Sequence, residues 1–331
     1  MQRTKLFCSS FSVKPLFPTQ PCCSFNQRTT LFRKTFTRQQ QQQQHGTSAT
    51  YNRPKLFAPF CFTVGVGGFS FGACAIVQYE RTRNHSTLRN HWDNFKKRTS
   101  RMQKEFDLRE RTKQWWDGLG EARRMAAVLI GINVAVLGAW RVASSRGFME
   151  RWFTHSPSDG RVAPLLLSCF SHMEVWHCGA NMYVLWSFAP LIHEIMGSEQ
   201  LAAFYITGGC FSSLASHYFK VASRAGAVAS LGASGALLAV LAACCVKRPD
   251  AQLQIIFLPF LTFSAQAGLM GVIALDVCGL LFKWRLFDHA AHLGGNLFGC
   301  WYVTYGHTYL WDQRAPLIRK WHEMRKSWSD D

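Results

Sequence analysis

Acidic residues are absent from the first 79 positions of this 331-residue chain, which carry nine Lys and Arg residues. Residues 1–55 also combine Arg with Ser and Thr, and they lack the long apolar stretch of a secretory signal. A basic, acid-free leader of this kind is typical of mitochondrial transit peptides. We therefore predict that residues 1–55 direct import into mitochondria, with a disordered basic tail as the alternative. The glutamine run at 39–44 is interpreted as low-complexity sequence.

Several motif classes are missing as well. The 12 cysteines include no C-x-x-C pair, so the usual spacing for structural zinc or for thioredoxin-type redox chemistry is lacking. There is no glycine-rich phosphate loop, and the net charge of +18 does not form a recognisable DNA- or RNA-binding motif. We therefore expect no metal, no small-molecule cofactor and no nucleic-acid partner.

Charge is scarce in the rest of the chain. After residue 124, 207 residues hold only 15 Lys and Arg and 12 Asp and Glu. This part contains several apolar runs of about 20 residues, the length needed to cross ~30 Å of hydrocarbon. A soluble two-domain protein is thereby excluded, and the sequence predicts an all-α membrane protein, a polytopic helical bundle. The expected spans are 56–79, 125–140, 166–190, 199–218, 226–246, 264–282 and 288–309.

One N-terminal span is thus separated from six closely spaced spans. The basic segment between them is interpreted as an interfacial helix or linker, with Trp115 and Trp116 at headgroup level. Residues 253–263, interrupted by Pro259, are expected to form a loop or a half-buried lead-in. The predicted parts are the extension 1–55, the first span 56–79, the basic linker 80–124, the six-span core 125–310 and the polar tail 311–331.

Four polar side chains within the spans stand out because polar groups inside a membrane are costly. His177 and Asn181 lie in the third span, Ser234 in the fifth and His292 in the seventh. These spans enter from the same side, so the four residues lie at comparable depths, about 10–15 Å in at 1.5 Å per residue. A serine nucleophile, a histidine base, and amide or imidazole donors in one layer are what acyl transfer requires.

Each of these residues is ordinary when taken alone. Ser234 could merely bond a backbone carbonyl or mark close helix packing, and its surroundings depart from the G-x-S-x-G elbow of soluble hydrolases. However, Gly295 and Gly299 form a small face on the seventh span, which allows close approach to another backbone. A neutral His292 could then accept the proton of Ser234.

Three motifs follow one another along the chain: His-x-x-x-Asn at 177–181, Gly-x-Ser-Gly at 232–235 and Ala-His-x-x-Gly at 291–295. In this order they resemble the rhomboid intramembrane serine proteases. The one-plus-six arrangement with its basic extension, and the stretch Phe287–Gly295, resemble the mitochondrial presenilin-associated rhomboid-like branch. The resemblance covers about residues 125–310.

The resemblance implies a role for each candidate residue. Ser234 would be the nucleophile and His292 the general base and acid, in a dyad without an aspartate. His177 and Asn181, with the backbone N–H of Ser234, would form the oxyanion hole. The implied protein is a serine endopeptidase of the inner mitochondrial membrane. It would lie among membrane lipid and cleave the transmembrane segments of single-span mitochondrial membrane proteins.

Two other functions stay open. A catalytically silent rhomboid-like protein would bind transmembrane segments without cutting them, although the presence of both Ser234 and His292 argues against it. A solute carrier could use buried His, Asn and Asp residues to line a path, but no internal inverted repeat is evident.

The remaining ionisable residues have simpler interpretations. Asp276, in the sixth span, is expected to bond a neighbouring helix, and Asp288 is expected to pair with Lys283 or Arg285. His289 shares a helix face with His292 in sequence, but two histidines supply too few ligands for a metal.

Two residues of the core are expected to act structurally. The resemblance implies that His172 fixes a loop by donating a hydrogen bond, and Glu194 would be a structural anchor at most. His193 and Glu194 begin like the H-E-x-x-H motif, but a glycine stands in the final position, so a zinc protease is unsupported.

Overall fold

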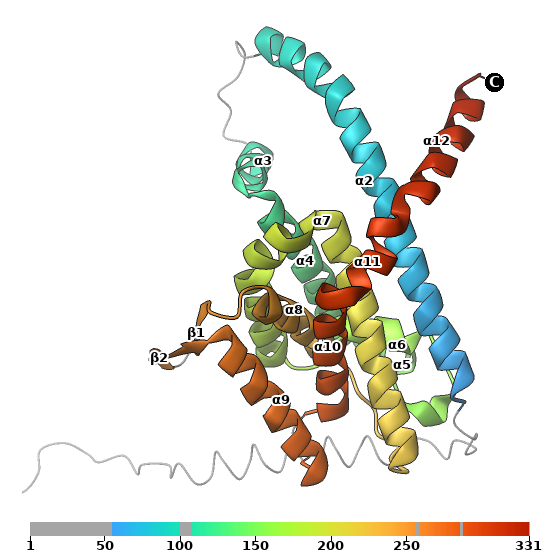
Figure 1. The fold of residues 1–331 in the computed structure, drawn as a ribbon, viewed down its shortest axis with the longest axis vertical. Coiled ribbons are helices and arrows are strands. Elements are labelled where there is room, and N and C mark those ends of the chain that lie inside the picture. Colours follow the sequence, from blue (N-terminus) through green and yellow to red (C-terminus); the bar gives the residue numbers. More distant parts are fainter. Residues whose placement is uncertain (1–54, 100–107, 256–257, 285–286, 331) are drawn as a thin grey trace, which may run out of the picture. The chain divides into compact units, whose positions relative to one another are not determined.

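The computed structural model describes residues 55–99, 108–255, 258–284 and 287–330. The chain separates into two compact units, Met1–Ser48 and Ala49–Asp331, and all described residues belong to the second. This unit is mostly helical (Figure 1), as the sequence predicts. The expected transit peptide at 1–55 lies outside the described residues except for Lys55.

Helices of very different lengths follow one another, with one small hairpin between them and short 3₁₀ turns at several connections. A π-helical turn, Tyr302–Gly306, joins α10 to α11. The elements are α2 (Phe57–Thr99), α3 (Leu108–Gly118), α4 (Glu121–Arg141), α5 (Arg146–Trp152), α6 (Pro164–Leu167), α7 (Val175–Ala222), α8 (Ser234–Lys247), β1 (Gln252–Ile255), β2 (Leu258–Ser264), α9 (Ala265–Leu281), α10 (His289–Trp301), α11 (His307–Leu310) and α12 (Ala315–Asp330).

Two helices in the described part of the chain are long and apolar enough to cross a membrane, judged by length and composition: Phe57–Arg83 within α2, and α4. Helices α8 and α9 are apolar but shorter. Two such helices are weak evidence by themselves, since core helices and signal sequences pass the same test. The one-plus-six span count therefore stays a prediction.

Helix α7 combines two of the expected spans. The chain bends at Gly197, whose φ of 72° and ψ of 177° interrupt the helical path. Glycine suits this position because a positive φ is unfavourable for residues with a Cβ. The expected start of the third span at residue 166 is wrong. Helix α7 begins at Val175, because the preceding residues form the short helix α6 and a 3₁₀ turn.

Helix α8 also begins later than its expected span, 226–246. Its first residue is Ser234, because the backbone just before it is bonded elsewhere. Ser230 pairs with His155 in an isolated β-bridge, and the Gly232 N–H donates to the Ser168 carbonyl at 2.9 Å. Gly232 itself has a φ of 134°, which favours glycine and is incompatible with a helix.

Helix α2 continues to Thr99 instead of ending at residue 79. Residues 80–99 contain neither Pro nor Gly, so no strong helix breaker stops the helix after the apolar stretch. The segment 80–124, expected to be one linker, therefore comprises the end of α2, the helix α3 and the start of α4, together with positions 100–107, which lie outside the description.

Within the segment 253–263, the described residues 253–255 and 258–263 belong to a strand pair and not to a loop. Strands β1 and β2 are antiparallel, with Leu253 opposite Phe263. The hairpin leads directly into α9, so the expected lead-in to the next helix is present in another form.

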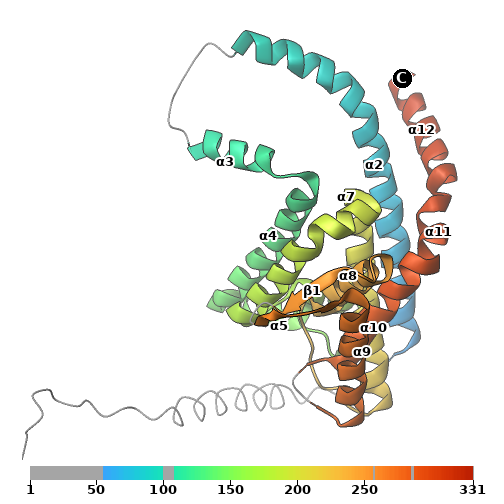
Figure 2. The same ribbon diagram turned by 60° about the vertical axis from the view of Figure 1, so that its left-hand side comes forward.

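The C-terminal tail is helical from Ala315 to Asp330, and this helix, α12, packs on α2 (Figure 2). The Trp321 indole donates a hydrogen bond to Glu80 at 2.9 Å, and Tyr79 bonds His322. These contacts join the last helix to the first described one.

Helices α7, α8 and α10 form the centre of the unit, and α2 and α4 pack against α7. Glycines allow α8 and α10 to touch. A Cβ on Gly295 would lie 2.1 Å from the carbonyl oxygen of Gly235, and one on Gly299 would lie 2.3 Å from that of Ala239. The close backbone approach expected from the Gly295–Gly299 spacing is confirmed.

Candidate active site

Ser234 and His292 meet where α8 and α10 begin. The Ser234 Oγ lies 2.9 Å from His292 Nε2. Ser234 is the first residue of its helix and His292 lies in the first turn of its own. The contact between Gly235 and Gly295, each near one of these side chains, brings the two helix starts together. The imidazole is thus placed to accept the serine proton.

A cavity of about 210 Å³ adjoins this pair. Asn181, Asp276, Ser234 and His292 contribute its polar lining. The remaining lining is apolar and consists of Val184, Leu237, Leu238, Val272, Leu275 and Phe287. A mostly apolar cavity with a few convergent polar groups is typical of a ligand site, and here it suits an apolar peptide segment.

A larger cavity, of about 310 Å³, lies elsewhere. Its lining includes Arg81, Glu121 and Ser198 and none of the four candidate residues. The Arg81 guanidinium bonds Glu121 at 2.6 Å and Glu199 at 2.9 Å, so the charges there pair with one another. We place the chemistry in the smaller cavity because it contains the nucleophile and the base.

Asn181 and His177 lie one turn apart on α7. The Asn181 Nδ2 lies 2.9 Å from the His177 carbonyl oxygen and 3.2 Å from His172 Nε2. Since a primary amide has two N–H donors, one of these contacts must open before Asn181 donates to a substrate oxygen. The His177 ring packs against Gly232, with its Cε1 3.2 Å from where a Cβ of residue 232 would stand. His177 is not among the residues that line the cavity.

His172 holds the chain just before the nucleophile. The Ala233 N–H donates to His172 Nε2 at 3.5 Å. Burial, and to a smaller extent the nearby His177, lowers the pKa of His172 to about 4, so its ring is neutral at physiological pH. The expected loop-fixing contact is present, but at this atom His172 accepts the hydrogen bond from Ala233 instead of donating one.

The start of α8 supplies further donors. The first N–H groups of a helix have no acceptor within the helix, and they carry its partial positive charge. Ser234 and Gly235 occupy these positions. Their N–H groups can therefore stabilise negative charge that develops next to the Ser234 hydroxyl.

Asp276 of α9 extends this arrangement. Its Oδ1 lies 3.2 Å from His292 Nδ1 and 2.8 Å from His289 Nδ1. The expected bond from Asp276 to a neighbouring helix is confirmed, since both histidines belong to α10. The resemblance implied a dyad without an aspartate, and this expectation does not hold, since Asp276 lies next to His292. The contact could not be foreseen, because spacing along the chain does not reveal which residues of two different helices meet. A carboxylate in the middle of an apolar helix was the available signal.

The same three side chains, Asp276, His289 and His292, could hold a metal ion, because their ligand atoms lie within 4.8 Å of one another. The histidine pair that was expected to supply too few ligands thus has a third group beside it. The two short Nδ1–Oδ1 distances are equally those of hydrogen bonds from the imidazoles to the carboxylate.

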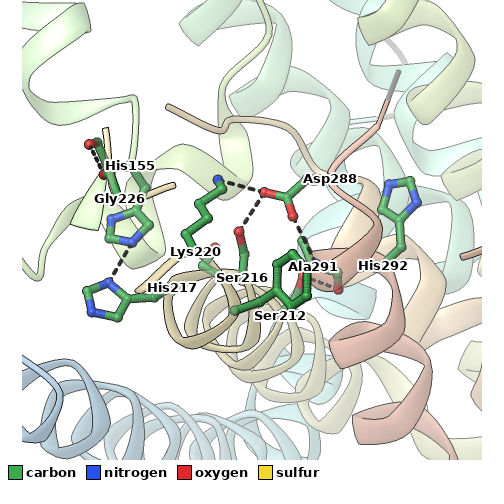
Figure 3. A network of polar contacts seen from close by, with 12 residues as sticks. His155, Ser212, Ser216, His217, Lys220, Gly226, Asp288, Ala291 and His292 are labelled. Carbon is green, nitrogen blue, oxygen red and sulfur yellow. Dashed lines mark hydrogen bonds and ion pairs between the residues drawn. The ribbon is translucent and has the colours of Figure 1, made fainter. Parts of the chain in front are cut away.

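Asp288 anchors the start of α10 (Figure 3). Its carboxylate accepts from the Lys220 ammonium at 2.9 Å and from the Ser216 hydroxyl at 2.6 Å, and it caps α10 through the Ala291 N–H. The expected partner Lys283 is wrong, because α7 places Lys220 closer, and Arg285 lies outside the described residues. Burial opposes the charge, but Lys220 and Ser216 outweigh it and lower the pKa of Asp288 to about 2.

Next to this anchor lies a pair of stacked histidines (Figure 3). The His155 Nε2 lies 3.1 Å from His217 Nδ1, and His217 Nε2 lies 3.0 Å from the Lys55 carbonyl oxygen. Burial, followed by the neighbouring His217 and Lys220, lowers the pKa of His155 to about 3. The pair thus connects the loop before α6 with the residues that precede α2.

Glu194 and His193 do not contribute to the site. Glu194 pairs with Arg248 at 2.6 Å on an exposed surface, which agrees with a minor structural role. His193 bonds the Ser198 hydroxyl at 3.0 Å, next to the bend at Gly197.

Comparison with known proteins agrees with the resemblance that the three sequence motifs indicate. Residues 159–309 match the family model of the rhomboid domain. The chain is 46% identical over 275 residues to the presenilin-associated rhomboid-like protein, mitochondrial, of Homo sapiens, which covers 82% of this chain and 72% of that protein.

More distant proteins are similar over less of the chain or at lower identity. Presenilin-associated rhomboid-like protein A, mitochondrial, of Danio rerio is 43% identical over 292 residues, covering 82% of this chain and 76% of its own. Rhomboid protein 1, mitochondrial, of Saccharomyces cerevisiae is 31% identical over 188 residues, covering 55% of this chain and 54% of its own.

Proposed function

Because this chain belongs to the rhomboid family, as a relative of its mitochondrial presenilin-associated members, we propose that it is an intramembrane serine endopeptidase. One observation carries the proposal. The only serine that lines the apolar cavity of about 210 Å³ has its Oγ 2.9 Å from the Nε2 of a histidine. Ser234 is the proposed nucleophile and His292 the proposed base.

The first half of the reaction forms an ester. The Ser234 Oγ attacks the carbonyl carbon of the scissile peptide while its proton passes to His292 Nε2. Helix-start N–H groups at Ser234 and Gly235 stabilise the oxyanion, joined by Asn181 after it releases one of its present partners. The C–N bond then breaks, the leaving amine takes the proton from His292, and the acyl group stays on Ser234.

The second half returns the enzyme to its starting state. A water molecule gives its proton to His292 Nε2 and attacks the ester carbon. When the C–Oγ bond breaks, the Ser234 oxygen recovers that proton, and the substrate leaves with a new carboxyl terminus. Atoms and charges balance without any metal or redox partner.

The cavity lining favours an apolar substrate segment, and so we propose that the substrates are single-span membrane proteins. A helix keeps its backbone hydrogen bonds in lipid, so a substrate helix must unwind locally to bring a carbonyl carbon to Ser234. The curated relatives are named mitochondrial, and with the basic leader this supports the inner mitochondrial membrane as the proposed location.

Replacement of the nucleophile tests the proposal. Ser234→Ala should abolish cleavage of a single-span reporter in proteoliposomes and also labelling by a fluorophosphonate probe, because the attacking oxygen is gone. Ser187→Ala is a matched control, since the Ser187 hydroxyl is exposed on α7 and bonds only the Tyr183 carbonyl among the described residues. It should cleave and label as the wild type does.

Cleavage by Ser234→Ala at the wild-type rate would overturn the serine mechanism. A wild-type protein that binds the reporter, is not labelled and does not cut would instead favour the catalytically silent binder. Reporter-independent solute flux through the proteoliposomes, unchanged in Ser234→Ala, would favour a carrier.

A further inference from the structure

We propose that Asp276 is a positioning residue of this protease, holding His292 in the orientation and tautomer that let Nε2 accept the Ser234 proton. The inference rests on the proposed serine endopeptidase function and adds a third group to its machinery. Asp276 lies in the wall of the cavity but is 0% exposed, so it would not touch the substrate. It would act through the imidazole ring.

The contacts place Asp276 behind His292 as seen from Ser234. One ring nitrogen of His292, Nε2, lies 2.9 Å from the Ser234 Oγ, and the other, Nδ1, lies 3.2 Å from Asp276 Oδ1. A neutral imidazole has one N–H and one lone pair. If Nδ1 carries the hydrogen and donates it to the carboxylate, Nε2 must present its lone pair to the serine, which is the state that general-base catalysis needs.

Burial of Asp276 strengthens the effect of its contact with His292. Asp276 is fully buried, with 0% of its surface exposed, and its Oδ2 has no hydrogen-bond partner in the described part of the chain. Water therefore cannot readily replace the carboxylate as acceptor for His292 Nδ1. A buried acceptor without competing solvent orients a ring more strongly than an exposed one.

The neighbouring helices are shaped to hold the carboxylate. His289 Nδ1 lies 2.8 Å from the same oxygen, so a second imidazole steadies Asp276 from the preceding turn of α10. His289 fits there only because position 279 of α9 is glycine. A Cβ on Gly279 would lie 2.4 Å from the His289 ring.

The variant Asp276→Asn distinguishes a role of Asp276 in positioning His292 from a role in packing α9 on α10. The amide has the same shape, but it can donate to His292 Nδ1 and so favour the tautomer with hydrogen on Nε2, which cannot accept a proton. We expect kcat for reporter cleavage to fall by about 10²-fold, with KM changed less than about threefold. Asp276→Glu, which keeps the carboxylate, should recover part of the loss.

The pH profile is the readout that a packing role would not move. Asp276 contacts His292 Nδ1 directly, so Asp276→Asn should displace the acid limb of the kcat profile, which a change in helix packing alone would leave in place. Asp250→Asn is the matched control, because Asp250 lies in an exposed turn after the end of α8 that is opposite to Ser234. Its kcat, KM and pH profile should equal those of the wild type.

Together, the two variants test the positioning role of Asp276 and the protease function separately. If Ser234→Ala is inactive while Asp276→Asn keeps the wild-type kcat and acid limb, the positioning role is wrong and the protease stands. If Ser234→Ala is fully active, the protease itself is wrong. Should Asp276→Asn lose kcat only in proportion to its folded fraction, measured by thermal unfolding in detergent, with an unshifted acid limb, Asp276 merely packs α9 on α10.

Discussion

His155 illustrates how one buried side chain makes stability depend on pH. Its ring is 1% exposed and stacks on His217, and Lys220 adds a positive charge to the same region, with the Asp288 carboxylate as the opposing group. Protonating His155 would place an additional cation there. The folded protein therefore keeps this ring neutral well below the pH at which a free histidine titrates.

Stability should consequently fall in mild acid. The pKa of His155 is about 3 in the folded protein and 6.5 for the free side chain, so between these values the unfolded chain binds more protons. The contribution is intact above pH 6.5 and is lost as the pH falls towards 3. Between pH 7.5 and 5 the free energy of unfolding should drop by about 2 kcal/mol from this residue.

Denaturant titration in detergent at several pH values measures this effect. The variant His155→Gln removes the titrating group, and the difference between wild type and variant isolates its contribution. An identical pH dependence in the two proteins would contradict the prediction.

At the scale of elements, the contact between α8 and α10 decides where the site forms. Gly299 faces the Ala239 carbonyl and Gly295 faces that of Gly235, so no side chain separates the two backbones. Ser234 and His292 lie at the same end of this contact. Widening it would separate nucleophile and base as well as weaken packing.

Gly299→Ala should therefore destabilise the protein. The added Cβ would lie 2.3 Å from the Ala239 carbonyl oxygen, and such overpacking costs about 1–3 kcal/mol. Gly271→Ala, in α9, is the matched control because, apart from the adjacent backbone of its own helix, no atom lies within 4 Å of its Cβ position. That change should be neutral or stabilising by up to about 1 kcal/mol, since alanine favours a helix.

Thermal unfolding in detergent, combined with reporter cleavage, tests these two variants. Equal melting temperatures for the Gly299→Ala and Gly271→Ala proteins would mean that α8 and α10 do not pack as closely as described.

At the scale of the whole molecule, the chain combines a rhomboid domain with a basic extension. Residues 1–79 have no acidic side chain, and the curated relatives are named mitochondrial. Helix α2 follows the extension and packs on α7 of the rhomboid core, and α12 packs on α2. The additional N-terminal helix is therefore an integral part of the packed unit.

The extension should direct import. Residues 1–55 fused to a soluble fluorescent reporter should carry it into mitochondria, because Arg-rich leaders without acidic residues are the composition that import favours. A matched fusion in which the nine Lys and Arg residues of this leader are changed to Gln should stay in the cytosol. Cytosolic retention of the unmodified fusion, in cells that import a control presequence, would contradict the assignment.

The sequence alone determined the helical class, the order of the helices and the two central residues of the candidate site. Apolar runs and scarce charge are local properties, and they place α2, α4, α8, α9 and α10 without any knowledge of packing. Glycine spacing predicted the close approach that brings Ser234 to His292. Helix ends were less well predicted, because the start of α8 depends on backbone bonds to Ser168 and His155 far along the chain.

Only the tertiary structure decided which side chains support that pair. Asp276 contacts His292, and Lys220 contacts Asp288 across 68 residues, because of how α7, α9 and α10 are rotated about their axes. Such rotation depends on how side chains of different helices interlock, which no periodicity within one helix specifies. Asp288 had nearer basic residues in sequence, yet it pairs with the lysine that packing brings into its reach.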